Sequence, residues 1–106
     1  MSAEFFVKFD STEWYRQNQS PLRSHLCALP TFARVENGEY WLRGTEPDTP
    51  GRWAFDVRLW LREDCVELDI SARPHSVEAD LKQLFAWLRS QTSIAVVDDD
   101  GEPTGW

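Results

Sequence analysis

The residue types that carry most enzyme chemistry are sparse in this chain. It has only two histidines, His25 and His75, so a catalytic triad or a histidine-based metal cluster has few places to form. His25 sits among the leucines of a predicted helix and His75 just precedes another, so both are interpreted as structural or solvent-facing. No nucleophile-elbow, zinc-protease, P-loop or dinucleotide-binding motif occurs. We therefore expect a protein that is not an enzyme, with no catalytic residues, no cofactor and no metal site.

The densest group of acidic residues surrounds Gly101. Its members are Asp98, Asp99, Asp100 and Glu102. A calcium-binding loop with Gly101 at its glycine position would need Val96 as the first ligand, and valine offers no ligand side chain. The group is therefore interpreted as an acidic turn, with a contact for a basic partner and a weak cation site as the alternatives.

Tryptophan is unusually common, with six copies in 106 residues. Trp41 and Trp60 fall on the polar faces of their predicted strands, and Trp60 is flanked on its own face by Arg58 and Arg62. Tryptophan and arginine are enriched among the residues that dominate binding energy at protein interfaces. Burial under a loop, stacking on local arginines and contact with a partner all fit this placement. We take Trp60, Trp41 and Arg58, together with the acidic group, as the candidate partner-binding residues.

The net charge indicates the class of partner, and the length indicates the number of domains. Eighteen acidic residues against eleven basic ones give a net charge of −7, which would repel a phosphate backbone and favour a basic protein partner. A chain of 106 residues has the size of one domain with one core, so we expect a single domain over residues 1–106.

The apolar runs and the cysteines bear on where in the cell the protein is expected. The apolar runs are far shorter than the roughly 20 residues that span a bilayer, and the first residues lack a secretory leader pattern, so we expect a cytoplasmic protein with no membrane contact. Cys27 and Cys65 lie far apart without zinc or redox spacing, and both are expected to be buried thiols.

The first half of the chain predicts a strand, two short helices and a hairpin. Alternation favours a strand over 4–9, Asp10 is expected to cap a first helix, and Ser20 followed by proline is expected to begin a second. Asn37-Gly38 is typical of a type I′ turn in a hairpin over 32–42. That turn places Val35 opposite Tyr40, Ala33 opposite Leu42, and Arg34 opposite Trp41, where the guanidinium can stack on the indole.

The second half predicts a loop over 44–51, strands over 52–62 and 66–72, a helix over 77–91 capped by Ser76, and a strand over 94–97. Trp53 and Phe55 are assigned to the core face of the first of these strands. Arginines on that strand and carboxylates on the next are expected to pair. Together the elements indicate an α+β fold, a mainly antiparallel sheet of about five to six strands with helices on one face, resembling an elaborated ferredoxin-like layer.

The last third of the chain resembles a known class. The helix with Leu84-Phe85-x-Trp87-Leu88, the strand Ile94-Ala-Val-Val97 and the turn Asp98-Asp-Asp-Gly-Glu102 are similar to the C-terminal end of many small bacterial immunity proteins. These are cytoplasmic antidotes in polymorphic toxin systems of the contact-dependent inhibition, Rhs and type VI kinds. The resemblance implies an inhibitor that binds the catalytic domain of a cognate toxin, as a monomer or a homodimer.

Three other classes stay open on the residues alone. A small-ligand-binding or regulatory sensor domain could use the loop over 44–51 as a lid over the sheet. A structural subunit or homodimer could pair through an edge strand. A hydrolase could work with acidic residues alone, although no carboxylate pair is set in apolar surroundings that would raise one pKa.

Overall fold

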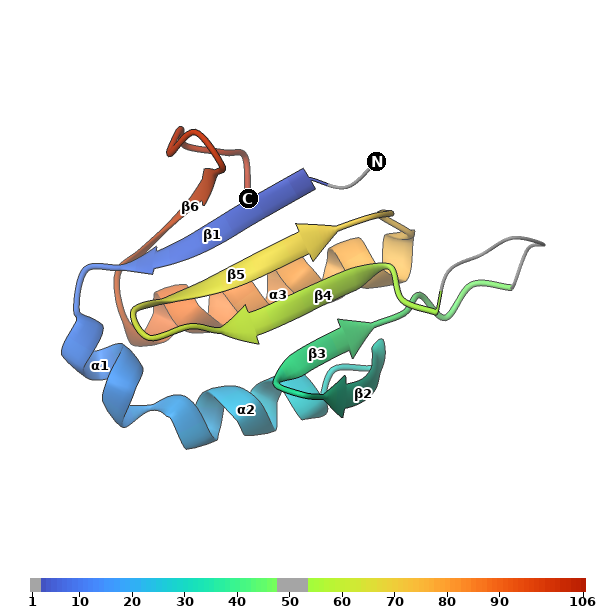
Figure 1. The fold of residues 1–106 in the computed structure, drawn as a ribbon, viewed down its shortest axis with the longest axis horizontal. Helices are drawn as coiled ribbons and strands as arrows, with labels where there is room; N and C mark the ends of the chain where they lie inside the picture. The colour runs from blue at the N-terminus through green and yellow to red at the C-terminus, as the bar shows by residue number, and fades with distance from the viewer. Residues whose placement is uncertain (1–2, 48–53) are drawn as a thin grey trace.

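The computed structural model describes residues 3–47 and 54–106, and its centre is a six-stranded sheet (Figure 1). The strand order is β2-β3-β4-β5-β1-β6, and every neighbouring pair is antiparallel. The strands are β1 (Ala3–Phe9), β2 (Phe32–Glu36), β3 (Glu39–Leu42), β4 (Val57–Leu61), β5 (Cys65–Ile70) and β6 (Ile94–Asp98). Strand β1 lies between β5 and β6, so the sheet joins the beginning of the described chain to its end.

This arrangement confirms the expected α+β class. The four strands β6-β1-β5-β4 follow the order of a ferredoxin-like sheet, in which helices connect the first strand to a hairpin and the hairpin to the last strand. The β2–β3 hairpin extends this sheet beyond β4. Asn37 and Gly38 have φ values of 51° and 81°, which only a turn with two left-handed residues requires, so the Asn-Gly turn forms as predicted.

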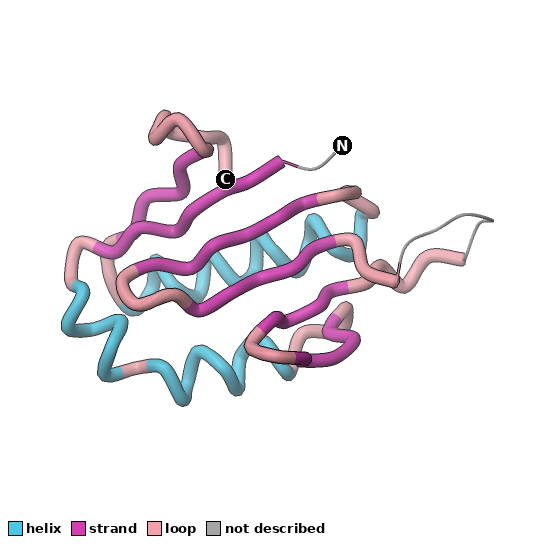
Figure 2. Tube along the Cα trace, viewed as in Figure 1, coloured by secondary structure: helices cyan, strands magenta, loops and turns pink. Residues whose placement is uncertain are grey.

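The helices are α1 (Thr12–Gln17), α2 (Gln19–Cys27) and α3 (His75–Gln91). In Figure 2, α3 runs behind the strands, while α1 and α2 follow the border of the sheet. The apolar side of α3 is buried on the sheet as predicted, and its buried residues are Val77, Leu81, Leu84, Phe85 and Leu88. Helix α2 contacts α3 through a His25–Trp87 ring stack at 4.3 Å. Thr31, in the segment between α2 and β2, donates two hydrogen bonds to the Asp80 carboxylate on α3. His25 therefore has the structural role expected from the sequence.

Tyr15 links α1 to the turn between β4 and β5 by hydrogen bonds. Its side chain is fully buried, and its hydroxyl lies 2.6 Å from the Arg62 carbonyl oxygen and 3.0 Å from the Cys65 carbonyl oxygen. Burial raises the pKa of the Tyr15 hydroxyl above its ordinary value, since the phenolate loses its solvation.

Replacing Tyr15 with phenylalanine is expected to lower the free energy of unfolding by about 1 kcal/mol at neutral pH. Since the folded pKa of Tyr15 is raised, its contribution is complete below the unfolded pKa of about 10 and is lost as the pH rises through the folded value. Urea denaturation at pH 7 and at about pH 10.5 measures both effects. A difference between the two proteins that stays constant over this range would contradict the assignment.

Several local predictions are wrong at helix starts. Ser11, not Asp10, caps α1 by accepting a hydrogen bond from the Trp14 backbone. Helix α2 begins at Gln19 after Asn18, so Ser20 lies inside it. Helix α3 begins at His75, and the Ser76 backbone N–H and hydroxyl both donate to the Glu46 carboxylate. In this last case the Glu46 carboxylate, in the segment that follows β3, takes the place of a local cap.

Other corrections concern strands and cysteines. A bulge between Phe32 and Arg34 sets Phe32, not Ala33, opposite Leu42. Strand β4 begins at Val57, and Trp53 lies outside the described residues. Cys65 is buried as expected, but Cys27 is exposed on α2.

A separate finding concerns membranes. None of the helices in the described ranges is long and apolar enough to span a bilayer.

Candidate functional site

The candidate site is the face of the sheet that points away from α3, here called the open sheet face. Figure 1 looks onto this face, with α3 behind the strands, and within the described ranges no helix lies over it. Alternation along β3, β4, β5 and β1 places polar and aromatic side chains there, while their neighbours enter the core. The strand residues of this face that matter below are Glu4, Phe6, Glu39, Trp41, Arg58, Trp60, Glu67 and Asp69.

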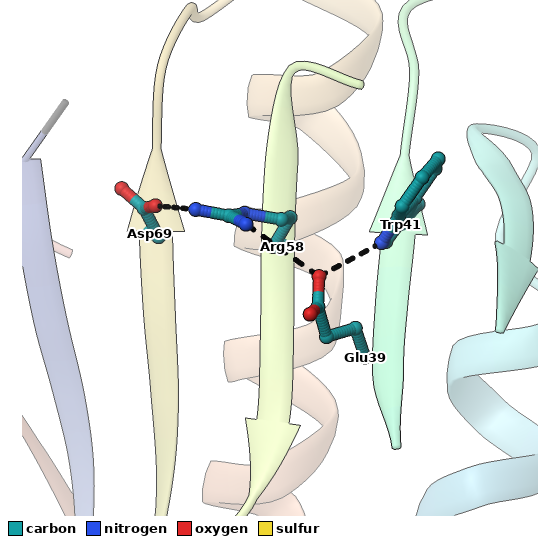
Figure 3. Close-up of polar contacts among 4 residues, drawn as sticks. All are labelled: Glu39, Trp41, Arg58 and Asp69. Atoms are coloured by element: carbon teal, nitrogen blue, oxygen red, sulfur yellow. Dashed lines mark hydrogen bonds and ion pairs between the residues drawn. The ribbon is translucent and has the colours of Figure 1, made fainter. Parts of the chain in front are cut away.

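Arg58 lies at the centre of the open sheet face (Figure 3). Its Nη2 is 2.6 Å from Asp69 Oδ2 on β5, and its Nη1 is 3.6 Å from Glu39 Oε1 on β3. The same Glu39 oxygen accepts a hydrogen bond of 3.1 Å from Trp41 Nε1. Three strands are thus joined by one polar network, which limits the rotamers of all four side chains.

Two aromatic rings contact the Arg58 guanidinium. The guanidinium carbon is 4.7 Å from the ring centre of Phe55 and 5.2 Å from that of Trp60. Phe55 also contacts Trp41, with ring centres 5.1 Å apart. The assignment of Phe55 to the core is therefore wrong, because its segment lies outside β4 and does not follow the alternation of that strand.

Arginine stacking recurs at both sides of this centre. Arg62 lies over Trp60 at 5.3 Å and pairs with Glu67 at 3.0 Å, while Arg34 lies over Trp41 at 5.0 Å. Stacking on local arginines was one of the alternatives that the sequence left open for Trp41 and Trp60, and the structure shows it. The cross-strand pairing of arginines with carboxylates was expected. Both tryptophans are half-buried, so each ring keeps part of its surface exposed to solvent.

Three arginines of the face are already paired within the chain. Arg34, Arg58 and Arg62 each pair with a carboxylate, at 3.2, 2.6 and 3.0 Å respectively. A phosphate backbone is bound by cations that are free to replace its counterions. The geometry thus gives no support to nucleic-acid binding at these arginines.

The acidic group forms a tight turn at the end of β6, apart from the aromatic centre. Asp98 Oδ1 accepts hydrogen bonds from the backbones of Asp100 and Glu102, and Gly101 has a φ of 79°. Asp98 is thus used to shape the turn, whereas Asp99, Asp100 and Glu102 are exposed. Strand β6 lies three positions from β4 in the sheet, or about 14 Å away. The structure therefore separates the acidic candidates from Trp41, Arg58 and Trp60.

Few of the described residues offer reactive chemistry. Burial raises the pKa of the Cys65 thiol, which makes its nucleophilic thiolate form less available. Carboxylate oxygens of Asp98, Asp99 and Asp100 lie within 4.8 Å of one another, but Asp98 is engaged in its turn and the other two are exposed. An acidic turn that binds no metal has the same arrangement, so these three carboxylates do not indicate a metal site.

Sequence reasoning missed two residues of the central network. Neither Glu39 nor Asp69 was named as a site residue, although carboxylates on the strand after Arg58 were expected to pair with arginines and alternation places both residues on the same side as Arg58. Their importance depends on the register across β3, β4 and β5, which pairs Trp41 with Arg58 and Arg58 with Asp69. Phe55 had no local pattern that would reveal its position.

Comparisons of the chain with protein-family models, with curated proteins and with solved structures gave no significant match. The functional argument therefore depends on the residues and geometry of the open sheet face.

Proposed function

We propose that this chain is a protein-binding inhibitor, an immunity protein that binds and neutralises the catalytic domain of a cognate bacterial toxin in the cytoplasm. The observation that carries the proposal is the aromatic and arginine centre of the open sheet face. Trp41, Phe55 and Trp60 are half-buried there. Arg58 contacts the rings of Phe55 and Trp60, and Trp41 donates a hydrogen bond to Glu39. Rigid aromatic side chains with exposed surface are typical anchors of tight interfaces.

The charge distribution supports a basic partner. The chain carries a net charge of −7, and the paired arginines of the open sheet face leave the exposed acids to dominate its field. An acidic field accelerates the encounter with a basic protein, and buried aromatic anchors slow dissociation. The exposed side chains of Asp99, Asp100 and Glu102 fit the first of these roles, and Trp41 and Trp60 fit the second.

The test is capture of the partner by the intact chain, followed by a neutralisation assay. The wild-type chain and the variant Trp41→Ser/Trp60→Ser serve as baits in lysate of the native host, with low-salt and high-salt washes. We expect one stoichiometric protein to remain on the wild-type bait through the high-salt wash and to be absent from the variant. Expressed alone in a tester strain, that protein should stop growth, and co-expression of the wild-type chain should restore it.

A control bait distinguishes a variant that has lost its binding residues from one that has lost its fold. Trp87→Ala removes a tryptophan of the helical layer, on the other side of the sheet, and should still capture the partner. The proposal is wrong if no stoichiometric protein is captured, or if the captured protein does not inhibit growth.

A further inference from the structure

The two edge strands of the sheet, β6 and β2, differ in what lies beside them. Along β6 the end of the chain covers the edge, since Val97 forms a bridge with Pro103, and the Thr104 backbone N–H and hydroxyl both donate to the Val96 carbonyl oxygen. Strand β2 lies at the opposite border of the sheet (Figure 1), and its residues 33–36 are exposed. An open edge strand is a template for pairing with another chain. The fold therefore covers one edge and leaves the other accessible.

The geometry of the hairpin shows which backbone groups of β2 face outward. Glu36 and Glu39 flank the two-residue turn, and the turn bond makes them a hydrogen-bonded pair. Because hydrogen-bonded and non-hydrogen-bonded pairs alternate along an antiparallel ladder, the next pair, Val35 and Tyr40, is non-hydrogen-bonded. The N–H and C=O of Val35 therefore point away from β3. Outside the strand ladders, no hydrogen bond of the described residues engages either group.

The side chains of β2 are complementary to a second copy of the same strand. Val35 is the one large apolar side chain that is exposed in the described ranges, at 50%. When two β2 strands run antiparallel with Val35 facing Val35, Arg34 of each copy lies opposite Glu36 of the other, and such opposite charges stabilise the pair. A shift of the two-fold axis by one residue sets Arg34 opposite Arg34, or Glu36 opposite Glu36, and like charges repel. The charges thus specify one register.

We infer that the chain forms a two-fold dimer through β2, in which the Val35 residues of the two copies exchange a pair of backbone hydrogen bonds. The inference goes beyond the proposed function and does not depend on it, because it concerns two copies of this chain. The two-fold axis between antiparallel strands is perpendicular to the sheet, so the open sheet faces of both copies lie on the same side of one continuous sheet. The pairing is short, since a bulge precedes Arg34 and the Asn37-Gly38 turn follows Glu36. Small interfaces are weak and transient, so the dimer forms at high protein concentration.

Sedimentation velocity of the purified chain measures this association. We expect the wild-type chain to shift from monomer toward dimer as its concentration rises into the millimolar range, and the Val35 amide proton to exchange more slowly with solvent over the same range. Val35→Pro removes the outward N–H, which makes no bond to β3, so the hairpin stays intact while the dimer is lost. A wild-type chain that stays monomeric at every concentration, or a Val35→Pro chain that dimerises like the wild type, would overturn the inference.

Charge reversal tests the register and does not depend on proline being tolerated. Arg34→Glu and Glu36→Arg each set like charges opposite each other in a dimer, so each variant should be monomeric, although the two change the net charge in opposite directions. An equimolar mixture of the two should form a mixed dimer, because every facing pair is then of opposite charge. Circular dichroism checks that both variants are folded. Failure of the folded variants to associate on mixing would show that the register is wrong.

The other occupant of this edge is a strand of the toxin. If the wild-type chain alone stays monomeric and Val35→Pro no longer captures the partner, the edge binds the partner and the dimer is rejected. Because the sedimentation experiments contain no toxin, the dimer can fail while the proposed function stands, and a failed capture leaves the dimer untouched.

Discussion

Replacing Arg58 with methionine is expected to lower the free energy of unfolding by about 3 kcal/mol. Methionine keeps most of the apolar stem but removes the guanidinium that faces Asp69, whose side chain is only 11% exposed. A buried carboxylate that loses its cation keeps the cost of desolvation without the compensating attraction. The stacks on Phe55 and Trp60 are lost as well. Urea denaturation at neutral pH, followed by far-ultraviolet circular dichroism, measures the change.

Arg62→Met is the matched control for this substitution. Arg62 also stacks on Trp60 and pairs with a carboxylate, Glu67, but its side chain is 50% exposed. An exposed pair contributes about 0–1 kcal/mol, so the control should change stability little. The double variant Arg58→Met/Asp69→Leu should recover part of the loss, because neither partner then leaves a buried charge. Equal effects of the two single substitutions would contradict the central role of Arg58.

Replacing Trp60 with alanine is expected to weaken binding of the captured toxin at least about 30-fold, which corresponds to about 2 kcal/mol. Trp60 is half-buried between Arg58 and Arg62, so its ring is rigid before the partner arrives and loses little entropy on binding. The loss should appear mainly as faster dissociation. Surface plasmon resonance with the immobilised toxin domain measures both rates.

Two further variants serve as controls for the Trp60→Ala experiment. Trp87→Ala removes an indole that stacks on His25 in the helical layer and should leave both rates unchanged. Asp99→Asn/Asp100→Asn should slow association, most visibly at low salt, without affecting dissociation, since these side chains are exposed. If Trp60→Ala binds like the wild type, the open sheet face is not the interface.

Much of the fold could be predicted because its determinants are local. The spacing of Leu81, Leu84 and Leu88 gives α3 one apolar side whatever lies against it, and all three are buried. Asn37-Gly38 specifies its turn because few other residues accept two left-handed conformations in succession. The first residues of the helices were harder to predict. Several nearby side chains can act as the cap, as at Asp10 and Ser11, and a distant group can replace it, as Glu46 does at Ser76.

The candidate site could be predicted only in part. Alternation was enough to place Trp41, Arg58 and Trp60 on polar strand faces and to pair Arg58 with a carboxylate. It was not enough to show that Glu39 joins the same network, since that depends on β3 being the neighbour of β4. Nor could it reveal that Asp69 is buried, because its surroundings come from β1 as well as β4.

By itself, then, the sequence determined the element types, the α3 core side, the Asn-Gly hairpin and the acidic charge balance, all of which depend on residue type and short-range spacing. The tertiary structure alone decided the strand order and the side of the sheet left without a helix in the described ranges. It also brought Glu4 opposite Asp69, although the two residues are far apart in the chain. Such pairings depend on the register of strands that meet only after folding, and this register is set by the shared core beneath them.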